Sequence, residues 1–287
     1  MTPRPLTQTA APPAWIAPAW FALLLSVCFA PALAGMAMEW IQDDDMGHGL
    51  FVPVLAAWVA WQKRSEWSAI PVEPSRWGLA LVILGGAQLI AGTLGAEMFV
   101  ARTAFLVSLV GVILHLGGMP WLRALAFPLL LLPFMIRIPA ILYNQVTFPL
   151  QLFASAVAET VLSAIGIPVL REGNILELAS QKLSVVEACS GIRSLLSLSF
   201  LSLIYAYFFD QKVWMRGVLL VLTIPIAVLA NAFRVTLTGV LSEYKKELAT
   251  GFFHSLEGWG VFMVALLMLV LVHQLVNRIH GLAARAS

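Results

Sequence analysis

Charged residues are scarce in this chain. Only 11% of its 287 residues are charged, 60% are hydrophobic, and the mean hydropathy is +0.89. A soluble globule of this length carries far more charge, so the composition excludes that class and indicates an integral membrane protein. The net charge of +2 comes without any dense basic cluster, which gives no support for nucleic-acid binding.

Cysteine is equally scarce, and the two cysteines, Cys28 and Cys189, lie in unlike settings. They make no disulfide framework, and no CxxC or Cys/His spacing typical of zinc is present, so we predict no metal and no cofactor. Cys28 lies in an unbroken apolar run, where a thiol is expected to pack as a small inert hydrophobe. Cys189 has a charged residue on each side, Glu187 and Arg193. Such a position suits a reactive thiol better than a packed one.

Apolar runs of near-membrane length predict the fold class, an all-α polytopic membrane protein with about eight transmembrane helices in a single domain over residues 1–287. Because Ala17 to Met38 is long enough to cross a bilayer, we expect a retained first span rather than a cleaved signal. The second run is short and contains Pro53, so a tilted or half-embedded helix is its alternative. The predicted spans are 16–38, 49–62, 77–95, 101–118, 122–136, 190–208, 214–240 and 256–277.

The stretch 138–169 is apolar but contains several prolines and polar residues, and a further crossing there would move Lys212 and Arg216 to the outside. We therefore predict an interfacial or re-entrant helix over this stretch. After it, residues 169–177 contain a Glu-Gly-Asn turn and residues 183–187 are extended in style. These segments predict a small extracytoplasmic hairpin before the helix that follows Cys189.

Basic residues in the loops favour one orientation. With both termini in the cytoplasm, nine Lys and Arg residues lie inside and six outside, which agrees with the positive-inside rule. The inside set is Arg4, Lys63, Arg64, Arg76, Arg123, Lys212, Arg216, Arg278 and Arg285. On this topology the stretches 39–48, 137–187 and 241–255 face outward.

Cys189 then heads a helix at the outer face, with Ser190 and Gly191 in its first turn and Arg193 one turn further along. A helix N-terminus and a nearby cation both stabilise a thiolate. The alternative for Cys189 is a packing role.

Two further candidates reach the same membrane level. Arg234 lies inside a predicted span, where an arginine is costly and marks a functional site, and Asn231 and Thr238 share its helix face. His254 lies just before the last predicted span. A thiolate, a guanidinium and an imidazole together suit acyl transfer through a covalent intermediate.

Each of these residues has a structural alternative. Arg234 is alternatively an ion-pair partner of Glu187 or Glu257, and His254 a hydrogen-bonded anchor. The remaining histidines His115, His273 and His280 have no motif around them and are interpreted as structural. The run Asp43 to Asp45 with His48 is expected to be a solvated loop, with a substrate entrance or a cation site as the alternatives.

Three stretches resemble the motifs of the exosortases, relatives of the archaeosortases and functional analogues of sortases. Glu187 to Gly191 is similar to the Ala-Cys-Ser-Gly nucleophile motif, Asn231 to Arg234 to the Asn-x-x-Arg motif, and His254 with Gly258 to the histidine motif. His48-Gly49 and the residues after it resemble an amino-terminal feature of the family. The resemblance covers most of the chain.

The resemblance implies a membrane-embedded cysteine protease or transpeptidase of the bacterial inner membrane, multi-pass, with its active site facing the periplasm. Its partners would be membrane-anchored proteins with a C-terminal sorting signal of the PEP-CTERM type, cleaved through a thioester, in systems tied to exopolysaccharide export. Cys189 would be the nucleophile, Arg234 the oxyanion or positioning residue and His254 the acid or base. Glu187, Ser190, Gly191, Arg193 and Asn231 would bind substrate or support the site.

Two other classes compete with this enzyme. The first is a non-enzymatic transporter or polysaccharide-export component that uses the intramembrane Arg234 and the acidic outer loop for solute. The second is a thiol oxidoreductase, which is weakened because no second cysteine is expected at the outer face.

Overall fold

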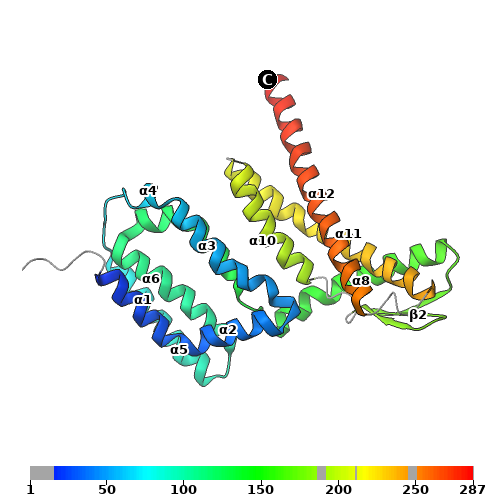
Figure 1. Ribbon diagram of the computed structural model, residues 1–287, viewed down its shortest axis with the longest axis horizontal. Coiled ribbons are helices and arrows are strands. Elements are labelled where there is room, and N and C mark those ends of the chain that lie inside the picture. Colours follow the sequence, from blue (N-terminus) through cyan, green and yellow to red (C-terminus); the bar gives the residue numbers. More distant parts are fainter. Residues whose placement is uncertain (1–15, 186–191, 211, 245–250, 287) are drawn as a thin grey trace, which may run out of the picture. The chain divides into compact units, whose positions relative to one another are not determined.

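The computed structural model describes residues 16–185, 192–210, 212–244 and 251–286, and side chains in these ranges other than those of residues 44, 192–194, 251–257 and 283–286. Figure 1 shows a largely helical chain with a small sheet. The chain forms two compact units, Met1–Arg137 and Ile138–Ser287. The single membrane domain expected over residues 1–287 stays a prediction.

The first unit is built from helices alone in its described part, residues 16–137. Its α-helices and two 3-10 helices are, in chain order, α1 (Ile16–Cys28), α2 (Ala30–Gln42), η1 (Asp44–Leu50), α3 (Phe51–Gln62), α4 (Arg64–Trp67), α5 (Arg76–Leu94), α6 (Met98–Ala124), α7 (Ala126–Leu131) and η2 (Leu132–Met135).

The first predicted span, 16–38, is broken. α1 and α2 meet at Phe29 with a bend of 68°. Pro31 lies in the first turn of α2, where its missing N–H costs nothing, but its ring prevents α1 from continuing as one straight helix. Cys28, at the end of α1, is exposed rather than packed, because α1 buries none of its residues in the protein.

Three glycines hold α5 against α6. Gly78, Gly85 and Gly92 recur every seven residues, so they share one face of α5, and all three are buried. A Cβ at Gly78 would lie 2.2 Å from the backbone nitrogen of His115, and one at Gly92 would lie 2.6 Å from that of Ala101. The two helix backbones therefore touch over most of the length of α5, in the small-residue packing typical of membrane helices.

The middle of the first unit differs from the predicted spans 101–118 and 122–136. α6 continues to Ala124 across a non-helical Gly118, whose φ is +79° and whose missing Cβ makes room for the carbonyl of Glu73. The second of these spans divides into the short α7 and η2. Proline explains the division, since Pro128 and Pro133 each remove a backbone donor.

The second unit surrounds two apolar clusters with four long helices and a sheet. Its elements are α8 (Ala140–Ala164), β1 (Val169–Glu172), β2 (Ile175–Leu178), β3 (Lys182–Ser184), α10 (Ile192–Phe209), α11 (Val213–Tyr244) and α12 (Gly251–Ala286). One cluster joins α8, the sheet and α11 around Leu162, Leu176 and Val235. The other joins α10, α11 and α12 around Leu198 and Leu219.

The strands pair in a three-stranded antiparallel sheet of order β1-β2-β3. Val169 pairs with Leu178, and Leu176 pairs with both Arg171 and Leu183. The β1–β2 turn uses Gly173 in the left-handed region, φ +66°. The sequence predicted a hairpin over these residues. Its placement outside the cytoplasm stays a prediction.

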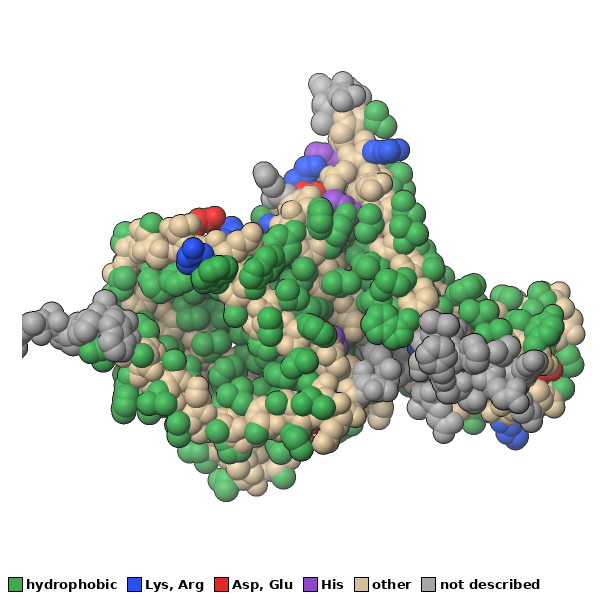
Figure 2. All heavy atoms as spheres, in the orientation of Figure 1, with side chains coloured by type: hydrophobic (Ala, Val, Ile, Leu, Met, Phe, Trp, Pro, Cys, Tyr) green, Lys and Arg blue, Asp and Glu red, His purple; other side chains and the backbone are tan. Residues whose placement is uncertain are grey.

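Five described helices are long and apolar enough to cross a membrane, or six if the bent α1–α2 pair counts as one span. The five segments are Arg76–Leu94, Met98–Ala124, Ala140–Ala164, Val213–Tyr244 and Gly258–Leu282. Eight spans are not confirmed. The stretch 138–169 contains a continuous 25-residue helix with span-like composition, and α3 has only 12 residues, about 18 Å. Hydrophobic side chains cover the visible outer faces of the helices, as a lipid environment requires (Figure 2).

Candidate functional site

The structure describes the predicted site residues unevenly. Glu187, Cys189, Ser190 and Gly191 lie outside the described residues. Arg193 and His254 are described for their backbone only, at the starts of α10 and α12. The meeting of Cys189, Arg234 and His254 in one pocket therefore stays a prediction, and the geometry of the site rests on Asn231, Arg234 and their surroundings.

Asn231 and Arg234 lie on α11, three residues apart and so on one face. Asn231 is buried, with 6% of its surface exposed, on a helix whose buried residues are mostly apolar. Thr238 was expected to continue this polar face, and its hydroxyl donates to the backbone carbonyl of Arg234 at 3.0 Å. This hydrogen bond is made within α11. Asn231 and Arg234 line the recess described next.

Arg234 lies against the backbone of α12. A Cβ built on Gly258 would be 2.9 Å from Nη2 of Arg234 and 3.0 Å from its Cζ, closer than a real side chain permits. The glycine thus lets the guanidinium approach α12. Gly258 lies one helical turn after His254, so the two residues share a face of α12. The Arg234 contact and the position of His254 therefore fall on neighbouring turns of one helix face.

A narrow, partly open recess with room for about one water molecule lies between α10, α11 and α12. Leu198 lines it from α10, Asn231 and Arg234 from α11, and Gly258 and Phe262 from α12. A second, equally narrow recess is lined by Leu150, Leu195 and again Asn231. Asn231 thus lines both hollows. A permanently charged guanidinium in so apolar a recess offers strong, fixed hydrogen-bond donors to an oxyanion or a carboxylate.

The segment that leads toward Cys189 is held by α8. Gln151 is buried and its Oε1 accepts a hydrogen bond from Nδ2 of Asn174 at 2.9 Å, while the hydroxyl of Ser155 donates to the carbonyl of Gly173 at 2.9 Å. The carbonyl of Asn174 accepts in turn from the backbone N–H of Val185 at 3.0 Å. Two polar side chains of an apolar helix therefore fix the β1–β2 turn, and this turn fixes Val185, four residues before Cys189.

Sequence reasoning did not single out Gln151, Ser155 or Asn174 as parts of the site. Thr147, Gln151 and Ser155 recur every four residues and so form a polar stripe on one face of α8, which is the signal that would have found them. The same reasoning treated the polar residues of this stretch as arguments against a span. The structure instead uses them to bind the sheet to α8.

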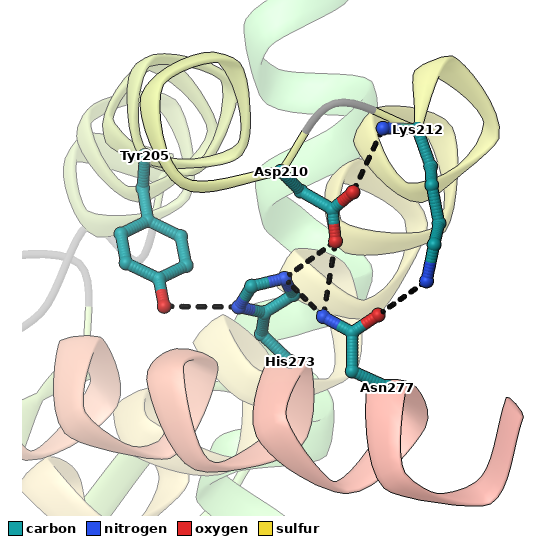
Figure 3. Close-up of polar contacts among 5 residues, drawn as sticks. All are labelled: Tyr205, Asp210, Lys212, His273 and Asn277. Carbon is teal, nitrogen blue, oxygen red and sulfur yellow. Dashed lines mark hydrogen bonds and ion pairs between the residues drawn. The ribbon is translucent and has the colours of Figure 1, made fainter. Parts of the chain in front are cut away.

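A second buried polar cluster was also missed. It joins the end of α10, the start of α11 and α12, and contains Tyr205, Asp210, Lys212, His273 and Asn277 (Figure 3). His273 was interpreted as structural, and Asp210 and Asn277 were not considered. His273 and Asn277, four residues apart in an apolar helix, are the pattern that would have indicated the cluster.

The acidic loop with His48 is not a solvated loop. It forms η1, in which Met46 is buried and both ring nitrogens of His48 are shielded from solvent. Burial lowers the pKa of His48 below its ordinary value, against smaller opposing effects from the backbone of Phe134 and Asp45 and from the Asp45 charge.

Ion pairing and close packing hold this loop in place. Asp43 makes an ion pair with Arg137, and the indole of Trp40 donates to the carbonyl of Met135 at 2.9 Å. Gly49 packs so closely on Trp40 that a Cβ there would lie 2.4 Å from the indole. These contacts join η1 and the end of α2 to η2 and the residues after it.

Comparison with known proteins gives one family. A family model described as transmembrane exosortase matches residues 40–271, most of the chain. Neither a curated protein nor a solved structure matches. The matched range includes Cys189, Arg234 and His254.

Proposed function

Because this chain belongs to the transmembrane exosortase family, which supports a membrane transpeptidase role, we propose that it is a cysteine peptidase or transpeptidase that cleaves C-terminal sorting signals of the PEP-CTERM type. The observation that carries the proposal is Arg234, a cation placed by Gly258 in an apolar recess between the three helices that carry or follow the motifs. An arginine in such a position is a functional-site candidate by default.

In the proposed reaction, the thiolate of Cys189 attacks the scissile carbonyl, forming a carbon–sulfur bond and an oxyanion. Arg234 stabilises that oxyanion or holds the substrate beside it, with Asn231 on the same helix face. The tetrahedral adduct collapses to a thioester as the carbon–nitrogen bond breaks, and His254 gives a proton to the leaving amine. Water or an amine then attacks the thioester and returns the thiol.

The fixed surroundings of Arg234 support this role. A guanidinium that is already in place when charge develops stabilises the transition state without reorganisation, and an apolar recess strengthens the interaction relative to water. The turn held by Gln151 and Asn174 supports a defined path for the segment before Cys189. Glu187, Ser190, Gly191 and Arg193 are proposed to support the nucleophile.

We further propose that the protein lies in the bacterial inner membrane with both termini in the cytoplasm and the site at the periplasmic face. On the topology in which α8 does not cross the bilayer, the distribution of Lys and Arg between the two sets of loops supports this orientation. A substrate whose basic tail stays in the cytoplasm would present its cleavage site at that level. The partners are thus membrane-anchored precursor proteins in the same bilayer.

The test is processing of a sorting-signal protein in cells that carry Cys189→Ala. The precursor is expected to stay full length on an immunoblot, whereas Cys28→Ala, which changes the other cysteine, leaves processing intact. Arg234→Ala is expected to reduce turnover by a factor on the order of 100 to 1,000, the loss usual for an oxyanion donor. Normal processing by Cys189→Ala would end the proposal, and solute transport that survives Cys189→Ala but not Arg234→Ala would favour the transporter.

A further inference from the structure

The polar cluster of Figure 3 joins three helices at a single point. Asp210, directly after α10, receives three hydrogen bonds. They come from Nε2 of His273 at 3.0 Å, from Nδ2 of Asn277 at 3.0 Å and from the backbone N–H of Lys212 at 2.8 Å. Nζ of Lys212 donates to Oδ1 of Asn277 at 3.0 Å. The residue after α10, the residue before α11 and two turns of α12 thus meet at one carboxylate.

The two central residues of the cluster are buried, and Tyr205, Lys212 and Asn277 around them are half-buried. Asp210 is 8% exposed and His273 is 6% exposed. Hydrogen bonds from His273, Asn277 and the Lys212 backbone outweigh the effect of burial and hold the pKa of Asp210 at about 2, so its carboxylate is ionised at any physiological pH. A buried charge is tolerated only where its partners are in place, so each partner has one allowed position.

Tyr205 completes the cluster on α10. Its hydroxyl lies 2.9 Å from Nδ1 of His273, and the two rings meet edge to face at 5.2 Å. A neutral His273 donates from Nε2 to Asp210 and accepts from the Tyr205 hydroxyl at Nδ1. A charged His273 donates from both nitrogens, and the hydroxyl accepts instead. The bonds of His273 to Asp210 and Tyr205 can thus be made in either state of the ring, and Nδ2 of Asn277 lies 2.8 Å from the same Nε2.

On each of the three helices, a similar length of helix separates the polar cluster from the candidate site. Arg234 lies 22 residues after Lys212 on α11, which is about 33 Å of helix. His254 lies 19 residues before His273 on α12, about 28 Å, and α10 begins 18 residues before Asp210, about 27 Å. Each helix is therefore fixed at one end and carries or follows a proposed catalytic motif near the other.

We propose that Asp210, His273, Asn277, Lys212 and Tyr205 are positioning residues that fix the axial register of α10, α11 and α12, and thereby the level at which their motif ends meet. This inference rests on the proposed function for its link to catalysis. If α12 slides by one turn along α10, its side chains move by about 5.4 Å, which breaks the bonds of both His273 and Asn277 to Asp210. Between apolar helix surfaces alone, a slide of this kind meets no comparable penalty, because one apolar contact replaces another.

The experiment measures register without catalysis. Cysteines are placed at Leu198 on α10 and Val261 on α12, which line the recess beside Arg234, in a Cys28→Ser and Cys189→Ala chain. A short bismaleimide then reports how readily the two positions are cross-linked in membranes. Asp210→Asn and His273→Phe, which keep the shapes of the side chains, are expected to lower the cross-linking rate severalfold. His280→Ala is the control near the same end, because it removes the α11–α12 ring contact with Trp214, over which Nζ of Lys212 also lies at 5.9 Å, and leaves the hydrogen-bonding groups of the cluster in place.

The same variants are then tested for cleavage with Cys189 restored. A displacement of about 1 Å at a reacting centre costs on the order of 100-fold, so kcat is expected to fall by about 10- to 100-fold while KM stays within about twofold. Tyr205→Phe removes only the hydroxyl and provides a milder variant where the others fail to fold.

The two measurements separate the two claims. An unchanged cross-linking rate in the variants refutes the claim that the cluster fixes the helix register, whatever their activity. A changed rate with an unchanged kcat overturns its importance for the reaction. A changed rate in a chain that never cleaves a sorting signal leaves the register supported and refutes the proposed function instead.

Discussion

The two units of the chain differ in how much their helix packing relies on buried polar side chains. Among the described residues, the buried polar side chains of the first unit are Arg102 and Ser108, whereas the second unit buries eleven. The first unit brings α5 and α6 together backbone to backbone at glycines. The second unit keeps its helices and sheet in place with side-chain hydrogen bonds. Burying a polar group in an apolar setting costs free energy unless its hydrogen-bond partners are in place. Such groups therefore favour one arrangement of the helices that carry them. The proposed site lies in the unit that contains most of these groups.

Ion pairs also contribute to the first unit, at the end of α2. Arg102 of α6 makes a two-pronged ion pair with Glu39 of α2, at 2.7 and 2.8 Å. Glu39 and Asp43 are both close to the end of α2, and both bind an arginine from a distant part of the unit. These two ion pairs therefore hold the end of α2, whereas α5 and α6 pack by shape at their glycines, with Gln88 of α5 donating to the carbonyl of Val100 and the hydroxyl of Thr103 on α6.

The largest expected loss of stability in the first unit comes from Gly78→Ala. The added Cβ would meet backbone atoms of His115 and Gly111 at 2.2 and 2.5 Å, which cannot move without separating α5 from α6. We expect a loss of about 3 kcal/mol or more, measured as a lower thermal midpoint in detergent. Gly86→Ala is the control on the same helix, since a Cβ there meets nothing within 4 Å. It is expected to be neutral or stabilising by up to about 1 kcal/mol, and equal effects of the two changes would refute the glycine packing.

The second unit is broken by removing a hydrogen bond rather than by adding volume. Gln151→Leu keeps the size of the side chain but leaves the amide of Asn174 without its acceptor. The cost is roughly 1 to 3 kcal/mol for a buried donor. Because Asn174 holds Val185, cleavage of the sorting signal is also expected to fall. Thr160→Ala, on the exposed face of α8, is the control, and equal loss of activity in both variants would show that the turn does not guide the segment before Cys189.

These contrasts show which parts of the molecule the sequence could predict. Apolar runs located most helices, because burial in lipid requires long hydrophobic segments, and the motif around Arg234 indicated its helix and family. The break at Phe29 and the division after Ala124 were missed, since prolines within an apolar run do not reveal by themselves whether a helix bends or ends. Nor did the run 138–169 reveal that its polar residues bind the sheet.

The candidate site was predictable only in part for a similar reason. Asn231 and Arg234 stand out because a charge in a span is rare. Asp210 and His273 are 63 positions apart and become significant only when α10 and α12 lie side by side. The contact of Arg234 with Gly258 likewise depends on packing between helices, and the predicted meeting with Cys189 and His254 lies outside the described side chains.

The stability of the second unit is expected to depend on acid through the carboxylate of Asp210. Its pKa in the folded chain is about 2, below the ordinary 3.8, so its contribution is present above about pH 4 and is lost as the pH falls through about 2. The shift corresponds to about 2 kcal/mol of stability. We expect the thermal midpoint of the wild type to fall between pH 4 and 2 more steeply than that of Asp210→Asn. Parallel curves for the two proteins would mean that the carboxylate gains nothing from His273 and Asn277.

The smallest expected effect is the pH response of His48 in the first unit. Burial lowers its pKa below the ordinary 6.5, so the unfolded chain takes up a proton before the folded chain does. Stability is therefore full above about pH 6.5 and declines as the pH falls below it, at values well above the window of Asp210. Replacing His48 by Gln removes the group that titrates, so the difference in thermal midpoint between pH 7.5 and 5.5 is expected to shrink. His280→Gln, which changes an exposed histidine of the second unit, serves as the control. If His48→Gln and the wild type lose the same stability over this range, the ring is protonated as easily in the folded chain as in the unfolded one, and the acid response of the first unit must come from its ion pairs at Glu39 and Asp43.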